Sequence, residues 1–183
     1  GWQEVELLWA AKEWGLTGHV SSQPAYNLLD RRAERELLPM AQSYGIAVIP
    51  WSPLAQGFLA GKYRRETVAP KGGRLTDYAG VQESGGLDSH SQEQVFDVID
   101  LLVALAAEKG CSVSQLALAW CMNQPGVTAP IIGPRTSEQL ADNLGACAIT
   151  MSAEDQRRLD AVIPPGHMLV HYMRATSAPR ARW

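Results

Sequence analysis

Two short apolar runs constrain the fold of this 183-residue chain more than any other feature. The runs are "IAVIPW" at 46–51 and "VTAPII" at 127–132, and both contain β-branched residues. Short continuous runs of this kind form strands that are buried on both faces, as in parallel sheets. A further short strand is expected around 18–22, in "GHVSSQ". We therefore expect three parallel strands.

Helical patterns separate these strands. Apolar residues recur at helical spacing, and glycines or capping residues mark the ends; the expected helices cover 2–14, 32–44, about 95–109, 113–122, 137–144 and 153–162. The alternation of buried strands with helices indicates an α/β fold with a parallel sheet. The Gly-rich segment 62–92 is longer than an ordinary connection, and it is read either as a lid over a site or as a mobile insertion.

The composition excludes several classes of protein. About 46% of the residues are hydrophobic, which is enough for the core of one ordinary domain. A net charge of −3 gives no electrostatic reason to expect nucleic acid or a charged membrane surface as partner. No apolar stretch approaches the roughly 20 residues that cross a bilayer, and no basic and apolar leader is present. The three cysteines form no C-x-x-C pair and are expected as free thiols in a reducing compartment, so we expect a cytoplasmic protein.

The stretch "IIGPRTSEQLADNL" at 131–144 joins the end of a strand to the start of a helix. Gly133 lets the backbone turn, Thr136 is suited to cap the helix, and Gln139 completes an S/T-x-x-Q capping box. A helix start carries free N–H groups and a partial positive charge, and Arg135 beside it offers a guanidinium suited to bidentate contact with phosphate. The pattern indicates a phosphate site, and an ordinary capped helix with a solvated Arg is the alternative.

The stretch "IPWSPLAQGFLAGKY" at 49–63 places Trp51 and Ser52 at the carboxyl end of a strand. Ligands bind at that end of parallel sheets. Trp51 offers a flat surface for a heterocycle and Ser52 a hydroxyl for a phosphate or amide, whereas a Trp that covers the core is the alternative. "GFLAGK" at 57–62 is not a P-loop, because only three residues separate its glycines and Tyr63 follows where Ser or Thr belongs.

In "SSQPAYN" at 21–27, Gln23 follows the first strand. Its amide has the donor and acceptor to recognise a carboxamide, and a structural Gln is the alternative. The charged residues within 30–36 are expected to form a solvated, ion-paired helix start. The four histidines are scattered without the spacing of a metal site, and neither G-x-S-x-G nor G-x-G-x-x-G occurs.

Together, "SSQPAYNLLDRR", "GIAVIPWSPLAQGFLAGKY" and "IIGPRTSEQLADNL", in this order, resemble the aldo-keto reductases. The resemblance is greatest to the branch that also contains the potassium-channel β subunits, and it covers about residues 2–166. It implies a (β/α)8 TIM barrel that binds NADPH in an extended form without a Rossmann motif.

The resemblance implies roles by matching position. Gln23 would hold the nicotinamide carboxamide, and Trp51 would stack on the nicotinamide ring. The pyrophosphate loop would contain Ser52, Leu54, Gln56 and Gly57, with Lys62 at its far side. The adenosine and its 2′-phosphate would be surrounded by Gly133, Arg135, Gln139, Asp142 and Asn143. No catalytic residue and no metal ligand is implied.

The resemblance also implies that the barrel is incomplete in this chain. A TIM barrel takes about 250 residues, whereas this chain matches only the sixth to eighth strands and the helix that precedes them. The catalytic Asp, Tyr, Lys and His of the family belong to the first four strands and have no counterpart here. We expect a partial barrel at 1–166, followed by a tail at 167–183.

Three hypotheses follow from this partial match. In the first, the chain is the NADPH-binding portion of a reductase and is not catalytically competent alone. In the second, it is a non-catalytic NADP(H)-binding regulatory module. In the third, it is a remnant that oligomerises. A carbonyl substrate is expected only if the missing half is supplied. The unpaired sheet edges favour self-association or a complementing chain.

Overall fold

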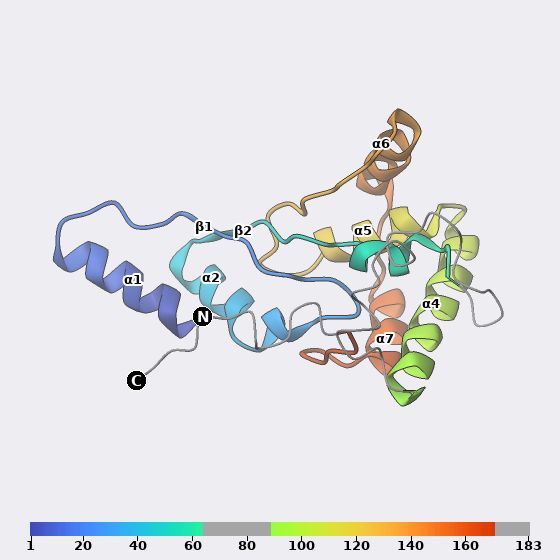
Figure 1. The fold of residues 1–183 in the computed structure, drawn as a ribbon, viewed down its shortest axis with the longest axis horizontal. Coiled ribbons are helices and arrows are strands. Elements are labelled where there is room, and N and C mark those ends of the chain that lie inside the picture. Colours follow the sequence, from blue (N-terminus) through green and yellow to red (C-terminus); the bar gives the residue numbers. More distant parts are fainter. Residues whose placement is uncertain (64–88, 171–183) are drawn as a thin grey trace.

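The computed structural model of this chain describes residues 1–63 and 89–170, without the side chains of 89–92 (Figure 1). Most of the predicted lid or insertion at 62–92, and the tail beyond 170, lie outside the described residues. The helices and strands are α1 (Trp2–Glu13), β1 (Ser21–Ser22), η1 (Arg32–Arg35), α2 (Leu37–Tyr44), β2 (Ala47–Val48), η2 (Ala55–Ala60), α4 (Ser89–Lys109), α5 (Val113–Met122), α6 (Ser137–Leu144), η3 (Gly145–Ala148) and α7 (Ala153–Val162), where η denotes a 3₁₀ helix. The predicted α/β class agrees with this order.

The sheet of the described residues consists of β1 and β2, which pair in parallel with Ser22 opposite Val48. The predicted third strand at 127–132 is present only as a segment beside β2, with one parallel bridge from Val127 to Val48. Prolines explain why the ladders are short. They stand at positions 24, 50 and 130, and each removes a backbone N–H that a regular ladder would use.

The predicted helix at 32–44 is divided in two. The 3₁₀ helix η1 ends at Arg35, Glu36 leaves the helical region with φ −144°, and α2 begins at Leu37. Pro39 accounts for the break, because in the interior of one long helix it would remove a hydrogen bond and clash with the carbonyl of Arg35. In the first turn of α2 it is tolerated, and Gly45 ends that helix in the left-handed region, with φ 68°.

The core lies among α4, α5 and α7, which gather at one end of the molecule in Figure 1. Leu102, Leu116, Trp120 and Leu159 are fully buried there. Among the described residues, no single helix is long and apolar enough to cross a membrane. Only α4 from Glu93 together with α5, a pair bent by 96°, meets that criterion by length and composition.

Helix α1 lies at the opposite end and has no buried residue. Its side chains Trp2, Leu7 and Trp9 are between 51% and 63% exposed, and Trp14, directly after the helix, is 76% exposed. Polar contacts attach α1 to the remainder, including a 2.7 Å hydrogen bond from Ser22 Oγ to Glu4 Oε1. Exposed aromatic side chains on one short helix are a typical feature of an interaction surface.

An ion pair stabilises the contact between α7 and α4. Lys109 Nζ lies 2.7 Å from Asp155 Oδ2, and the same oxygen accepts hydrogen bonds from Ser152 N and Oγ, each 2.7 Å. Burial opposes ionisation of Asp155, but the hydrogen bonds from Lys109 and Ser152 outweigh it and hold the pKa of this carboxyl below its ordinary value. The ionised carboxylate therefore stabilises the folded state.

We expect Asp155→Asn to weaken the dependence of stability on acid pH. Because the pKa of Asp155 is lowered in the folded protein, its contribution is complete above the unfolded pKa of about 3.9 and is lost as the pH falls through the folded pKa. Urea unfolding from about pH 6 to about pH 3 measures this loss. Glu154→Gln, which removes an exposed carboxylate from the same turn, is the control. An equally steep loss in Asp155→Asn and in the wild type would contradict the assignment.

Candidate functional site

The carboxyl ends of β1 and β2 place two predicted site residues on one face. The pairing continues beyond the strands, since Trp51 N donates to Pro24 O at 2.9 Å and Ala25 forms a parallel bridge with Trp51. Side chains alternate between the faces of a strand, so Gln23 and Trp51 lie on the face opposite the buried Val48. Gln23 is exposed and Trp51 is half-buried on this face.

The third segment reaches the same end of the sheet. Ile131 N donates to Pro50 O at 2.8 Å, which brings the chain leading to Gly133 and Arg135 beside the end of β2. Gly133 and the side chain of Arg135 are exposed. Within the described part of the chain, the Arg135 guanidinium forms no ion pair.

The predicted capping box at the start of α6 is only half formed. Thr136 Oγ1 accepts from Gln139 N at 3.2 Å, as expected, but Gln139 Oε1 accepts from the backbone N of Arg135 at 2.7 Å and not from that of Thr136. The Gln139 amide therefore holds the backbone that carries Arg135. The backbone bends before the helix. The Arg135 N–H, and not the N–H of the capping residue Thr136, therefore donates to the Gln139 side chain.

The loop after β2 has an unusual backbone. Ser52, Ala55 and Gln56 have φ values of 57°, 51° and 56°, and Gly57 has φ 104°. Positive φ is uncommon for residues other than Gly and costs of order 1–3 kcal/mol where it strains the backbone. Leu54, at φ −96° and ψ 14°, precedes the left-handed Ala55. The backbone N–H groups of Ala55 and Gly57 donate within the loop, to Ser52 O at 2.9 Å and to Leu54 O at 2.8 Å.

Side chains around Ser52 stabilise this loop. Asn27 Nδ2 donates to Ser52 O at 3.0 Å, and Ser52 Oγ accepts from Gln56 N at 3.3 Å. Leu54, Gln56 and Gly57 are partly buried, whereas Lys62 is exposed. The contact from Asn27 and the positive φ values were not predicted from the sequence. Gly57 is the only residue in this turn whose type favours a positive φ.

The two remaining candidates lie on the side of α6 that faces α5. Asp142 Oδ2 accepts from Ser112 Oγ at 2.9 Å, and Gln115 Nε2 donates to Asp142 O at 2.9 Å. Asn143 is buried. These contacts attach α6 to α5, so both residues have a structural role, and their role at a ligand stays a prediction.

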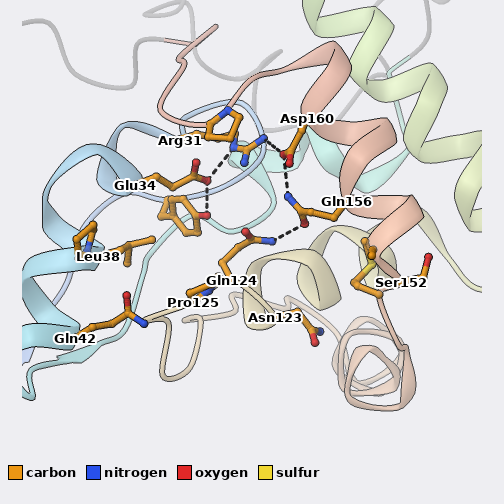
Figure 2. A pocket seen from close by; sticks show the side chains of 15 residues that line it. Arg31, Glu34, Leu38, Gln42, Asn123, Gln124, Pro125, Ser152, Gln156 and Asp160 are labelled. Carbon is orange, nitrogen blue, oxygen red and sulfur yellow. Dashed lines mark hydrogen bonds and ion pairs between the residues drawn. The ribbon is translucent and has the colours of Figure 1, made fainter.

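The charged residues after β1 form the predicted solvated helix start only in part. Arg32, Arg35 and Glu36 are exposed, whereas Asp30 and Arg31 are buried. Arg31 is 1% exposed; its Nε donates to Glu34 Oε1 at 2.8 Å and its Nη1 to Asp160 Oδ1 at 2.7 Å. Figure 2 shows Arg31 between Glu34 and Asp160. Tyr26 also donates its hydroxyl to Glu34 Oε1, at 2.6 Å. Burial, followed by the adjacent Glu34 carboxylate, raises the pKa of Tyr26 far above its usual range. Asp160 is 129 residues beyond Arg31, and no local pattern connects them.

Comparison with known proteins identifies the family. The model of the aldo/keto reductase family matches residues 2–164, which is most of the chain. This chain belongs to the aldo/keto reductase family. The match includes all three motifs that carry the resemblance, and the aldo/keto reductase family implies a (β/α)8 barrel.

Curated relatives agree with this assignment. The Bacillus subtilis (strain 168) protein described as the uncharacterized oxidoreductase YrpG is 35% identical over 167 residues, which are 91% of this chain and 47% of that protein. A probable voltage-gated potassium channel subunit beta of Oryza sativa subsp. japonica is 32% identical over 167 residues, 88% of this chain and 49% of its own length. A putative subunit of the same description from Schizosaccharomyces pombe (strain 972 / ATCC 24843) is 32% identical over 180 residues, 94% of this chain and 51% of its own length. The chain spans about half the length of these aldo/keto reductase relatives.

Proposed function

We propose that this chain is the NADPH-binding portion of an aldo/keto reductase. The observation that carries the proposal is the loop at Ser52–Gly57, where three residues other than Gly hold positive φ at the carboxyl end of a parallel strand pair. Such strain persists where the surrounding structure enforces it, and it is concentrated at ligand sites. Parallel sheets bind ligands at this end.

The residues present fit a dinucleotide with an additional phosphate. Gln23 and Trp51, on one face, suit a carboxamide and a flat ring. The loop with Ser52, Leu54, Gln56 and Gly57 is assigned to a pyrophosphate, and the exposed Lys62 beside it offers an ammonium that suits a phosphate. Arg135 is exposed and without an ion pair in the described residues, beside the start of α6 and Gly133, and suits a 2′-phosphate. Gln139 positions Arg135, and Asp142 and Asn143 support α6 and complete the adenosine side.

We propose that the proton donor comes from outside this chain. Bound NADPH supplies hydride for the reduction of an aldehyde or ketone to an alcohol. Tyr26 is unsuited to donate a proton to a substrate, because it is fully buried and its hydroxyl donates to Glu34. The catalytic Asp, Tyr, Lys and His of the family match no position here, so residues outside these 183, on the same or on another polypeptide, would supply them and, with them, access to a carbonyl substrate.

A second candidate function is a non-catalytic NADP(H)-binding module that acts through association. Two observations favour it: several relatives are described as channel subunits, and α1 exposes the large apolar side chains of Trp2, Leu7 and Trp9. This function needs the same cofactor site but no proton donor. Gel filtration with mass spectrometry separates a chain that binds copies of itself from one that recruits another polypeptide.

Titration with NADPH tests the cofactor site. We expect NADPH to quench tryptophan fluorescence and NADH to bind about tenfold more weakly, because one bidentate, charge-assisted contact to the 2′-phosphate contributes about 1.5–3 kcal/mol. Arg135→Ala should remove the preference for NADPH, and Trp51→Phe should remove most of the quenching. Arg157→Ala, at an exposed position on α7, should change neither.

Three results would contradict the proposal. Absence of quenching at near-millimolar NADPH would exclude the cofactor site in this chain. Equal affinity for NADPH and NADH in the wild type would exclude the role of Arg135. Carbonyl-dependent oxidation of NADPH by the 183-residue chain alone would show that the proton donor is present within it.

A further inference from the structure

A second cavity lies away from the proposed cofactor site. It has a volume of about 450 Å³ and is formed by the loop after β1, α2, the end of α5 and the beginning of α7 (Figure 2). This volume is within the range of about 300–1,000 Å³ that small-molecule sites occupy. None of its lining residues belongs to the twelve cofactor candidates.

A chain of side-chain amides forms one wall of this cavity. Gln156 Nε2 donates to Asp160 Oδ1 at 2.8 Å, and Gln124 Nε2 donates to Gln156 Oε1 and to Trp120 O, each at 3.0 Å. The carboxylate of Asp160 and the carbonyl of Trp120 only accept hydrogen bonds. Each amide must therefore point its nitrogen toward these acceptors, which fixes the positions of the amide oxygens of Gln124 and Gln156.

This orientation leaves two acceptors unused. Gln124 is 9% exposed. Its Oε1 accepts no hydrogen bond from the described residues and is an acceptor open to the cavity. Asp160 Oδ2 is also without a donor in that part of the chain. Both residues contact Gln156, so the two acceptors lie on either side of its amide on one wall of the cavity.

The charges near these acceptors are unbalanced. Arg31 is the one cation of the cavity wall, and it pairs with both Glu34 and Asp160. Glu34 has its other oxygen bonded to Gly166 N at 3.0 Å. One negative charge is therefore in excess, and it lies on the Asp160 side, where the carboxylate is 31% exposed.

We propose that this cavity binds a small organic cation, with an ammonium or guanidinium group on an apolar body. The cationic N–H groups donate to Asp160 Oδ2 and Gln124 Oε1 and balance the excess charge. The apolar body packs on Leu38, Pro39 and Met151, which also line the cavity. This inference is independent of the proposed cofactor site.

Benzylamine, with benzyl alcohol as its uncharged counterpart, tests this site on the full chain. Saturation-transfer NMR and titration calorimetry should show binding of benzylamine and at least about tenfold weaker binding of benzyl alcohol. In Asp160→Asn, Oδ1 still accepts from Arg31 and Gln156 while the free acceptor becomes an amide donor. Benzylamine affinity should therefore fall about tenfold. Glu154→Gln, which removes a carboxylate from α7 outside the cavity, should bind as the wild type does.

Each of the following outcomes would overturn the inference. Equal binding of benzylamine and benzyl alcohol would exclude recognition of charge, and unchanged affinity in Asp160→Asn would exclude this carboxylate. Displacement of benzylamine by NADPH would place it in the cofactor site. If Asp160→Asn does not fold, the wild-type side-chain amide resonances of Gln124 and Gln156 decide the matter, since they must shift with benzylamine if it binds here.

Discussion

Replacement of Arg31 by Met is expected to lower the free energy of unfolding by about 3–5 kcal/mol. The substitution keeps most of the side-chain volume but removes the cation between Glu34 and Asp160. Arg31 is fully buried, and its Nη1 also donates to the carbonyl of Ile163, at 2.5 Å. Without the guanidinium, Glu34 is an uncompensated carboxylate in a site with little water. The ion pair that connects the loop after β1 to Asp160 on α7 is also lost.

Urea unfolding by circular dichroism measures this loss, and two further variants interpret it. Arg31→Lys keeps the charge but loses the planar fork that contacts both carboxylates, so it should be intermediate. Arg157→Met removes an exposed Arg paired with Glu154 on α7 and should cost less than about 1 kcal/mol. A similar small loss in Arg31→Met would show that the buried network does not stabilise the fold.

Trp120→Ala is expected to be as damaging, with a loss of about 3–5 kcal/mol. Trp120 is fully buried in the last turn of α5. Its ring centroid lies 5.4 Å from that of Tyr26 and 5.2 Å from the Arg31 guanidinium carbon. Truncation to Ala therefore leaves a cavity in the core and removes the ring on which both of these side chains pack.

Trp120→Phe separates packing from polarity. The indole Nε1 is buried and has no hydrogen-bond partner among the described residues, so its removal relieves an unsatisfied donor. We expect Phe to cost only about 1–2 kcal/mol. Trp9→Ala, at an exposed position of α1, should change stability by no more than about 0.5 kcal/mol. The same urea experiment compares the three variants, and equal losses for Ala and Phe would contradict the packing argument.

Those parts of the fold that depend on local chemistry could be predicted from the sequence. Helix α5 begins after Ser112, whose side chain forms a capping box with Gln115, and α7 begins after Ser152 in the same way. Capping side chains and helical periodicity act over a few residues, so the sequence contains the whole signal. The division of 32–44 could also have been read from Pro39, but the apolar periodicity concealed it.

The candidate site was predictable only in part. Positions at the ends of β1 and β2 follow from strand order, and Gln23 and Trp51 do share a face. The left-handed backbone at Ser52, Ala55 and Gln56 could not be predicted, because side-chain and backbone contacts from Asn27 and within the loop stabilise it. Burial of Arg31 was equally inaccessible, since its carboxylate partner on α7 is distant in sequence and only the tertiary fold brings them together.

The prolines at 24, 50 and 130 have a consequence for how this chain meets other polypeptides. In the described residues β1 pairs only with β2, and an uncovered strand edge is ordinarily a template on which foreign strands add and fibrils grow. Here a proline removes a backbone donor from each extended segment after a few residues, so only a short length of strand edge can pair with a foreign strand. We therefore expect that any association of the described residues with another polypeptide would use the exposed side chains of α1 rather than these strand edges.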